Sequence, residues 1–152
     1  AEAAGRYLDR VAADWTADER SRARDTVLDV LADPAFSPVF VPGSRAEVAI
    51  QGAIAIGGRE RMIAGKVDRL AVGDDVLIVD YKITRPVPAG PSDVPDDHVI
   101  QLALYRRLLA AIFPGKTVRA GLLYVEAPRL IEVGEAALDA AFGRLDAALR
   151  TP

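Results

Sequence analysis

The sequence predicts an α/β fold in which a mixed central β-sheet is flanked by helices. Apolar runs typical of strands alternate with stretches of helical periodicity, in the order helix, helix, three strands, helix, two strands, helix. Residues 76–79 are four consecutive aliphatic residues, a pattern typical of a central strand that is buried on both faces. Hydrophobic residues make up 51% of the 152-residue chain, which is enough to form the core of a single domain.

Residues 1–41 are expected to form a helical lead-in. A first helix is predicted over residues 2–15, and Thr16 is placed to cap a second helix that runs to about Leu31 and stops before Pro34. The first helix has apolar residues at helical spacing, and those of the second helix are expected to pack inward. They are Tyr7, Leu8, Val11 and Trp15 in the first helix and Val27, Leu28, Val30 and Leu31 in the second.

Residues 42–134 are expected to form the sheet core, and residues 135–152 a C-terminal amphipathic helix. In chain order, we expect strands over 46–56, 61–70 and 76–81, a loop over 85–95, a helix over 97–113, and strands over 118–125 and 130–133. A tight turn at Gly57-Gly58 joins the first two strands. Four prolines keep residues 85–95 from forming regular structure.

The clearest chemistry lies at the ends of two predicted strands. Asp68 ends one strand, and Asp80 ends the next, with Lys82 on the same face as Asp80 because side chains alternate along a strand. A chain reversal between these strands places two carboxylates and one ammonium in one cleft. Two carboxylates suit Mg²⁺, and an adjacent lysine can hold a phosphate or an attacking water. These residues therefore indicate metal-assisted phosphodiester hydrolysis.

A solvated strand edge with a surface ion pair is the alternative interpretation of Asp80 and Lys82, and such pairs contribute little. Two features favour a site. Asp80 follows the four aliphatic residues, and a buried ionised group is costly unless it is paired or bound to a metal. On the predicted helix 97–113, Gln101 and Tyr105 are four residues apart and therefore neighbours on one face.

Taken in order, these motifs resemble those of the RecB-like branch of the PD-(D/E)XK nucleases. More narrowly, they are similar to the C-terminal nuclease domain of AddA-type bacterial helicase–nucleases. The resemblance runs from about Pro42 to the end of the chain and rests on residues 43–48, 65–70, 78–82, 101–106 and 121–124. It implies a restriction-endonuclease-like core, with residues 1–152 forming a single nuclease domain that is a fragment of a larger helicase–nuclease.

The resemblance also implies roles for the residues at the strand ends. Asp68, Asp80 and the backbone carbonyl of Tyr81 would be metal ligands, and Lys82 would orient the nucleophilic water or stabilise the transition state. The implied cofactor is Mg²⁺, with Mn²⁺ as an alternative. The chain has no Gly-rich phosphate loop, so no ATP site is expected within it.

Other residues match the family pattern less fully. Gln101 and Tyr105 would brace the site or touch DNA, and Glu47 matches a family glutamate, although a surface acid at a strand start is an equal alternative. The family usually has threonine where this chain has Ile83, and a histidine ligand on a helix before the first strand. The only histidine here is His98, which is expected to be a surface residue at a helix start with no role.

The implied activity is that of a metal-dependent exonuclease domain in double-strand-break repair, hydrolysing single strands as DNA is unwound. The implied partners are DNA, helicase domains of the same parent chain and an AddB-type subunit. Two alternatives stay open. One is a weak or inactive nuclease-like scaffold that docks a partner or guides DNA, and the other is a stand-alone restriction-type endonuclease.

Composition sets further expectations. A net charge of −3 is not that of a free-standing DNA binder, whose affinity comes largely from basic residues. The absence of cysteine excludes disulfides and zinc–thiolate sites. We expect a cytoplasmic protein with no membrane partner. The chain begins at Ala1 in apparently helical sequence, so we interpret it as a fragment that folds but is a weak nuclease or none.

Overall fold

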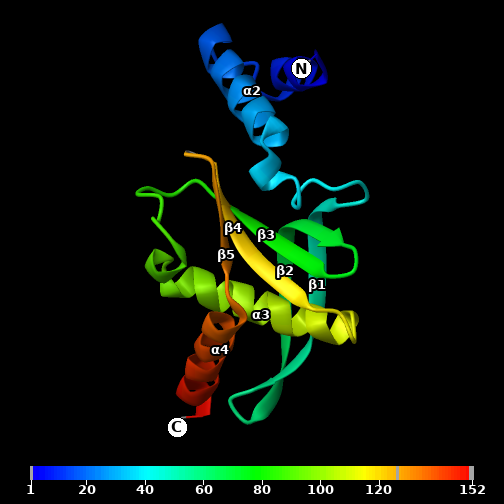
Figure 1. The fold of residues 1–152 in the computed structure, drawn as a ribbon, viewed down its shortest axis with the longest axis vertical. Helices are drawn as coiled ribbons and strands as arrows, with labels where there is room; N and C mark the ends of the chain where they lie inside the picture. Colours follow the sequence, from blue (N-terminus) through cyan, green and yellow to red (C-terminus); the bar gives the residue numbers. More distant parts are fainter. Residues whose placement is uncertain (1, 126, 151–152) are drawn as a thin grey trace.

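Five strands form one mixed sheet in the computed structural model, which describes residues 2–125 and 127–150 (Figure 1). The strands are β1 (Arg45–Ile56), β2 (Arg59–Val72), β3 (Val76–Lys82), β4 (Val118–Tyr124) and β5 (Arg129–Val133). They lie side by side in sequence order, and only β3 and β4 are parallel. A parallel pair needs a crossover, which helix α3 (Asp96–Ile112) provides. The predicted α/β fold with a mixed sheet is confirmed.

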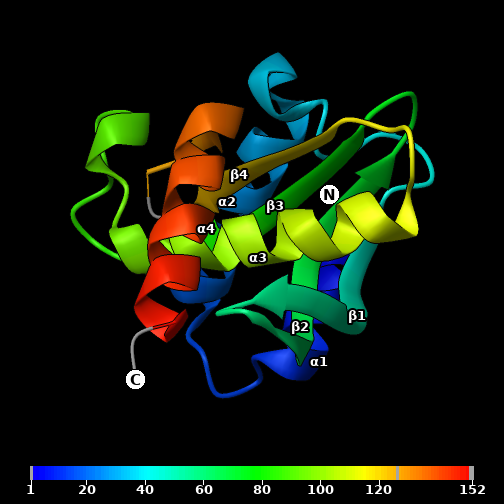
Figure 2. The same ribbon diagram turned by 90° about the horizontal axis from the view of Figure 1, so that it is seen from below.

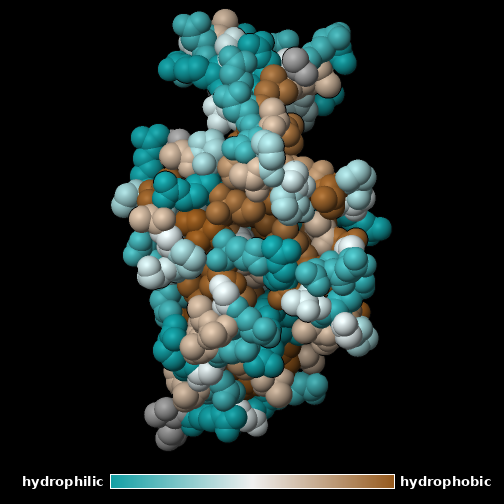
Figure 3. Space-filling view, viewed as in Figure 1, coloured by the Kyte–Doolittle hydropathy of each residue, from teal (hydrophilic) through white to brown (hydrophobic). Residues whose placement is uncertain are grey.

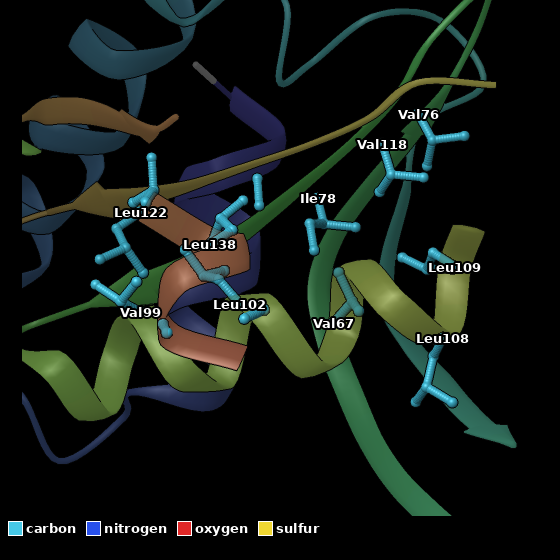
Figure 4. Packing of buried hydrophobic residues seen from close by; sticks show 14 of the residues in the cluster. Val67, Val76, Ile78, Val99, Leu102, Leu108, Leu109, Val118, Leu122 and Leu138 are labelled. Atoms are coloured by element: carbon cyan, nitrogen blue, oxygen red, sulfur yellow. The ribbon is translucent and has the colours of Figure 1, made fainter. Parts of the chain in front are cut away.

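One face of the sheet is covered by α3 and by α4 (Glu135–Arg150), as Figure 2 shows. Apolar side chains of both helices meet those of the strands in one continuous core (Figure 4). Its fully buried members include Val67, Val76, Ile78, Leu102, Leu108, Leu122 and Leu138. Because α3 lies across the strands that carry the predicted site, its side chains are positioned to reach that site.

The opposite face of the sheet has a smaller cover. Helix α2 (Ala17–Ala32) contributes Val30, and the 3₁₀ helix η1 (Pro34–Phe36) contributes Phe36. Both pack with Val39 against a second set of strand residues, namely Ala71, Leu77, Val79 and Leu123. Strand β3 is therefore buried on both faces between β2 and β4, as its run of aliphatic residues predicts.

The first two helices, α1 (Glu2–Val11) and α2, form an arm that projects beyond the sheet (Figure 1). The prediction that the first helix extends to Trp15 is wrong, because the chain turns where the Trp15 N–H donates to the carbonyl of Ala12 at 3.1 Å. The predicted cap is confirmed: Thr16 and Glu19 form a reciprocal capping box at the start of α2.

The expected inward packing of α2 holds only in part. Val30 is buried, but Val27 and Leu31 are 51% and 53% exposed. Only the end of α2 reaches the sheet, so Val27 and Leu31 are covered in part, and Leu28 is half-buried. Figure 3 shows hydrophobic surface where the arm joins the body.

Gly57 and Gly58 both have positive φ angles, as a tight hairpin turn requires, so the predicted turn is confirmed. The proline-rich loop contains one short 3₁₀ helix, η2 (Pro91–Asp93), before α3 begins. Among the residues that the structure describes, no helix is both long and apolar enough to cross a membrane.

Candidate active site

Asp80 and Lys82 lie at the end of β3, on the face that α3 covers. Asp80 is only 6% exposed and is the one buried charged residue among those described. Its Oδ2 is 2.7 Å from Nζ of Lys82, whose side chain is 15% exposed. Two charges removed from water in this way need each other, because the loss of either leaves an uncompensated buried charge. The pair is therefore a feature of the interior and not a solvated strand edge.

Gln101 joins this pair to the helix. Its Nε2 donates to Oδ1 of Asp80 at 3.1 Å and to the hydroxyl of Tyr105 at 3.3 Å. Its Oε1 accepts a hydrogen bond from Nζ of Lys82 at 3.1 Å. One amide therefore contacts both members of the ion pair and is itself braced one helical turn further along α3. The structure thus brings Asp80, Lys82, Gln101 and Tyr105 together in one polar network.

Asp68 lies on β2, beside the end of β3. Its Oδ2 accepts a hydrogen bond from the backbone N–H of Tyr81 at 2.7 Å. The last paired residues of these strands are Arg69 and Val79, so one further step in the same register places Asp68 opposite Asp80. Opposite residues of antiparallel strands have Cα atoms about 4.5–5.5 Å apart. The two carboxylates therefore start from neighbouring positions.

The alternation of faces along β2 breaks at Asp68. Val67 lies in the core beneath α3, but Arg69 reaches the other face, where it donates to the carbonyl of Val39 at 3.3 Å. Two residues two positions apart would share a face in a regular strand. Opposite the break, Glu47 has a φ of 56°, a left-handed backbone conformation that costs free energy in a residue with a side chain. The break turns Asp68 toward the backbone of β3.

Glu47 is not part of the network around Asp80. Its exposed carboxylate forms an ion pair with Lys66, and this contact raises the pKa of the Lys66 ammonium. Burial raises the pKa of Tyr81; Arg69 opposes this shift, and the charges of Asp68 and Glu47 add to it. Glu47 is therefore an exposed residue of β1, which is the surface position that the sequence left open.

Gly65 on β2 lies against Tyr105 of α3. A Cβ at this position would lie 2.5 Å from Cε1 and 2.7 Å from the hydroxyl of Tyr105. A glycine in the middle of a strand often marks such a close approach. The sequence placed Gly65 in a motif, but only the structure shows that its missing side chain makes room for Tyr105.

The prediction that Asp68 ends its strand is wrong, because β2 continues to Val72. The oxygen atoms of Asp68, within β2, and of Asp80 and Tyr81, near the end of β3, suit a small hard cation. Within the described residues, no group of three or more histidine, cysteine, aspartate or glutamate side chains is arranged to hold a metal ion. Mg²⁺, however, is usually held by one or two carboxylates together with several waters. Asp68, Asp80 and the carbonyl of Tyr81 are all oxygen donors, so the set fits Mg²⁺. A cation at Oδ2 of Asp80 must compete with Lys82 for that atom.

A family model described as the PD-(D/E)XK nuclease superfamily matches residues 1–150. The chain belongs to this superfamily. Members of the superfamily are generally nucleases that use divalent metals such as Mg²⁺. The solved structure of SSO0001 is similar to this chain, with a sequence identity of 15% and a TM-score of 0.44. The match covers 87% of this chain and 69% of that one. No curated protein matches the chain.

As a PD-(D/E)XK domain, the chain should depend on the contact between Gly65 and Tyr105. In Gly65→Ala, the new methyl group displaces the tip of the Tyr105 side chain, which weakens the hold on Gln101. We expect cleavage to fall by about tenfold, as for groups that orient metal ligands. We expect stability to fall by only about 1 kcal/mol, because the tip of a side chain can move. Single-turnover cleavage and thermal unfolding measure the two effects.

Gly143→Ala is the matched control for this substitution. It lies in α4, where an added Cβ meets nothing within 4 Å. The control should cleave as the wild type does, with slightly higher stability from the gain in helix propensity. Normal cleavage by Gly65→Ala would show that Tyr105 does not support the site.

Proposed function

We propose that this chain is a metal-dependent DNA exonuclease domain of an AddA-type helicase–nuclease that acts in double-strand-break repair and recombination. Its substrate is single-stranded DNA delivered by helicase domains of the same parent chain, with an AddB-type subunit as partner, in the cytoplasm. Superfamily membership and the order of the motifs support this proposal. A net charge of −3 fits a domain that receives DNA from a motor and does not capture it alone.

One observation carries the proposal. Asp80, Lys82, Gln101 and Tyr105 form a largely buried, fully connected polar network at the end of a central strand, with Asp68 beside it. A buried charged pair gives little stability compared with apolar packing, so its presence at a strand end favours a functional role. Hydrolysis of a phosphodiester accounts for each member of the network.

In this role, Asp68, Asp80 and the carbonyl of Tyr81 would hold Mg²⁺. Bound Mg²⁺ supplies an activated water and neutralises negative charge on the phosphate. Lys82 donates hydrogen bonds toward the negative charge that develops on the phosphate oxygens. Gln101 keeps Asp80 and Lys82 at fixed separation through hydrogen bonds to both.

A nuclease-like scaffold of weak or no activity is the second candidate. Both carboxylate oxygens of Asp80 already have partners, namely Lys82 and Gln101, so a cation has to share these oxygens with them or displace one of them. Ile83, where the family usually has threonine, is 75% exposed and supplies no hydroxyl near the network. These two observations favour a chain that guides DNA or docks a partner without cutting.

Metal-dependent cleavage by the parent protein distinguishes the two candidates. End-labelled linear DNA is incubated with the parent protein, ATP and either Mg²⁺, Mn²⁺ or EDTA. We expect single-strand products with Mg²⁺ or Mn²⁺ and none with EDTA. Strand separation with ATP and Mg²⁺ is measured in parallel and shows whether the parent protein unwinds the DNA. Unwinding without cleavage at any Mg²⁺ or Mn²⁺ concentration would support the scaffold and refute the nuclease.

A further inference from the structure

A pocket lies next to the proposed nuclease site. Its volume is about 480 Å³, and it is lined by the loop that follows β3 and by the start of α3. Thr84, two residues after Lys82, lines one side, and His98, three residues before Gln101, lines the other. The pocket therefore begins where the network of Asp80, Lys82 and Gln101 ends.

His98 is not the surface residue without a role that the sequence predicts. It lies in the first turn of α3 and is partly buried, and its Nδ1 is buried with no hydrogen-bond partner among the described residues. His98, Gln101 and Tyr105 are spaced i, i+3 and i+7, so they lie in one row along the helix. Unpartnered buried polar atoms are rare, which points to a partner outside the described residues.

Tyr124 is a second unpartnered group at the same end of α3. It is fully buried on β4, where it is paired with Lys82 in the strand register, and its hydroxyl has no hydrogen-bond partner in the described chain. Burial raises the pKa of Tyr124, and the nearby charge of Asp97, which lines the pocket, adds to this shift. The lining of the pocket includes Asp97 and His98 but not Tyr124, so Nδ1 of His98 is the unpartnered polar atom whose residue contacts the pocket directly.

The loop side of the pocket is held in place. The guanidinium of Arg129 donates to the carbonyls of Pro88 and Ala89 at 2.9 and 3.2 Å. Both residues line the pocket, so β5 anchors its wall from across the sheet. A wall fixed in this way needs little ordering when a ligand binds, which favours affinity.

The lining indicates which chemical group fits. Pro86, Val87 and Pro88 provide apolar surface. Arg85 contributes one positive charge to the lining, and Asp93 and Asp97 contribute two negative charges, so the net charge does not favour a phosphate. The volume falls in the range of about 300–1,000 Å³ that is usual for small-molecule sites. A flat, uncharged group with hydrogen-bonding edges, such as a nucleobase, satisfies both the apolar wall and the polar atoms.

We propose that this pocket binds one nucleobase of the single strand, next to the phosphate held at Asp80 and Lys82, and that His98 hydrogen-bonds to it. The proposal rests on the proposed nuclease function and extends it, because it names the part of the substrate that the chain recognises. His98 is then a binding residue and takes no part in bond cleavage.

The test measures binding separately from cleavage. The affinity of fluorescent oligothymidylate is measured in Ca²⁺, without Mg²⁺, for the wild type, His98→Ala and Ala89→Trp, whose indole fills the pocket from the exposed position 89. We expect each variant to bind about tenfold more weakly, as for the loss of one base contact. Gln51→Ala, on an exposed position of β1, is the control and should bind normally.

A scan with a single abasic nucleotide locates the base. In the wild type, one abasic position should weaken binding by the same factor as the variants, and in His98→Ala no position should matter. In Mg²⁺, cleavage by the parent protein at subsaturating DNA should fall about tenfold in both variants, in line with their weaker binding, whereas Gln51→Ala should cleave at the wild-type rate. Absence of cleavage by the wild-type parent protein would refute the nuclease function, whereas the Ca²⁺ binding data would still decide the pocket.

Three outcomes would overturn the pocket proposal. The first is wild-type affinity for oligothymidylate in both folded variants. The second is that the variants lose as much affinity for a fully abasic strand as for oligothymidylate. The third is a loss in His98→Ala that Ala89→Trp does not share. Thermal unfolding identifies a variant that fails to fold. If His98→Ala does not fold, Ala89→Trp decides alone, because its side chain is added at an exposed position.

Discussion

Asp80→Asn should abolish metal-dependent cleavage, and it should also lower stability because it leaves the Lys82 ammonium without its counter-charge. Asparagine keeps the shape of the side chain and can still bond to Gln101, but it removes the charge that would hold the cation. Because groups that merely orient metal ligands contribute 10–100-fold, we expect the loss of a ligand to exceed about 100-fold. Cleavage of end-labelled single-stranded DNA in Mg²⁺ measures the effect.

Asp74→Asn is the matched control for Asp80→Asn, because Asp74 lies in the exposed turn before β3. It should cleave at the wild-type rate. In the parent protein, Asp80→Asn should unwind DNA normally, since the site is separate from any motor. Wild-type cleavage by Asp80→Asn would show that the buried carboxylate is structural and that the catalytic assignment is wrong.

Lys82→Ala should impair both stability and cleavage. Removing the ammonium leaves Asp80, whose side chain is 8% exposed, with a buried charge and only the Gln101 amide as partner. Breaking a buried pair costs about 3–5 kcal/mol. At the lower figure, Tm should fall by about 6–12 °C in EDTA, since each kcal/mol shifts a domain of this size by about 2–4 °C. Calorimetry in EDTA and in Mg²⁺ measures the change.

Mg²⁺ should restore part of the lost stability in Lys82→Ala, because the cation replaces the ammonium at Oδ2 of Asp80 and no longer competes with it. Cleavage should stay low despite this binding. The matched control is Lys66→Ala, which removes an exposed ion pair with Glu47 and should leave the Tm close to that of the wild type. A Tm in Lys82→Ala that is low in EDTA and does not respond to Mg²⁺ would contradict metal binding at Asp80.

The arrangement of strands and helices follows from local patterns in the sequence. Four aliphatic residues before Asp80 predict a central strand, and β3 is buried on both faces. The boundary of the first helix was wrong because Trp15 continues its apolar spacing, although the chain turns at Ala12. Spacing alone does not show whether an apolar residue has anything to pack against, which is also why Val27 and Leu31 are exposed.

The site could be predicted in part. Gln101 and Tyr105 follow from i, i+4 spacing on one helix, and Lys82 shares a face with Asp80 by strand alternation. The amide that joins them could not be predicted, because it depends on how the crossover α3 lies over β3. The metal-ligand roles and the partners stay predictions until the experiments above are done.

The sequence by itself determined the order of the elements, the mixed sheet and which residues belong to the site motifs. Apolar periodicity and residue spacing are local properties, so they can be read from the sequence. Only the tertiary structure decided the break in alternation at Asp68, the space that Gly65 leaves for Tyr105, and the pocket at His98. Each depends on two segments that are distant in the chain and are brought together by packing. Such contacts follow from how helices and strands fill a common core, and no local pattern encodes them.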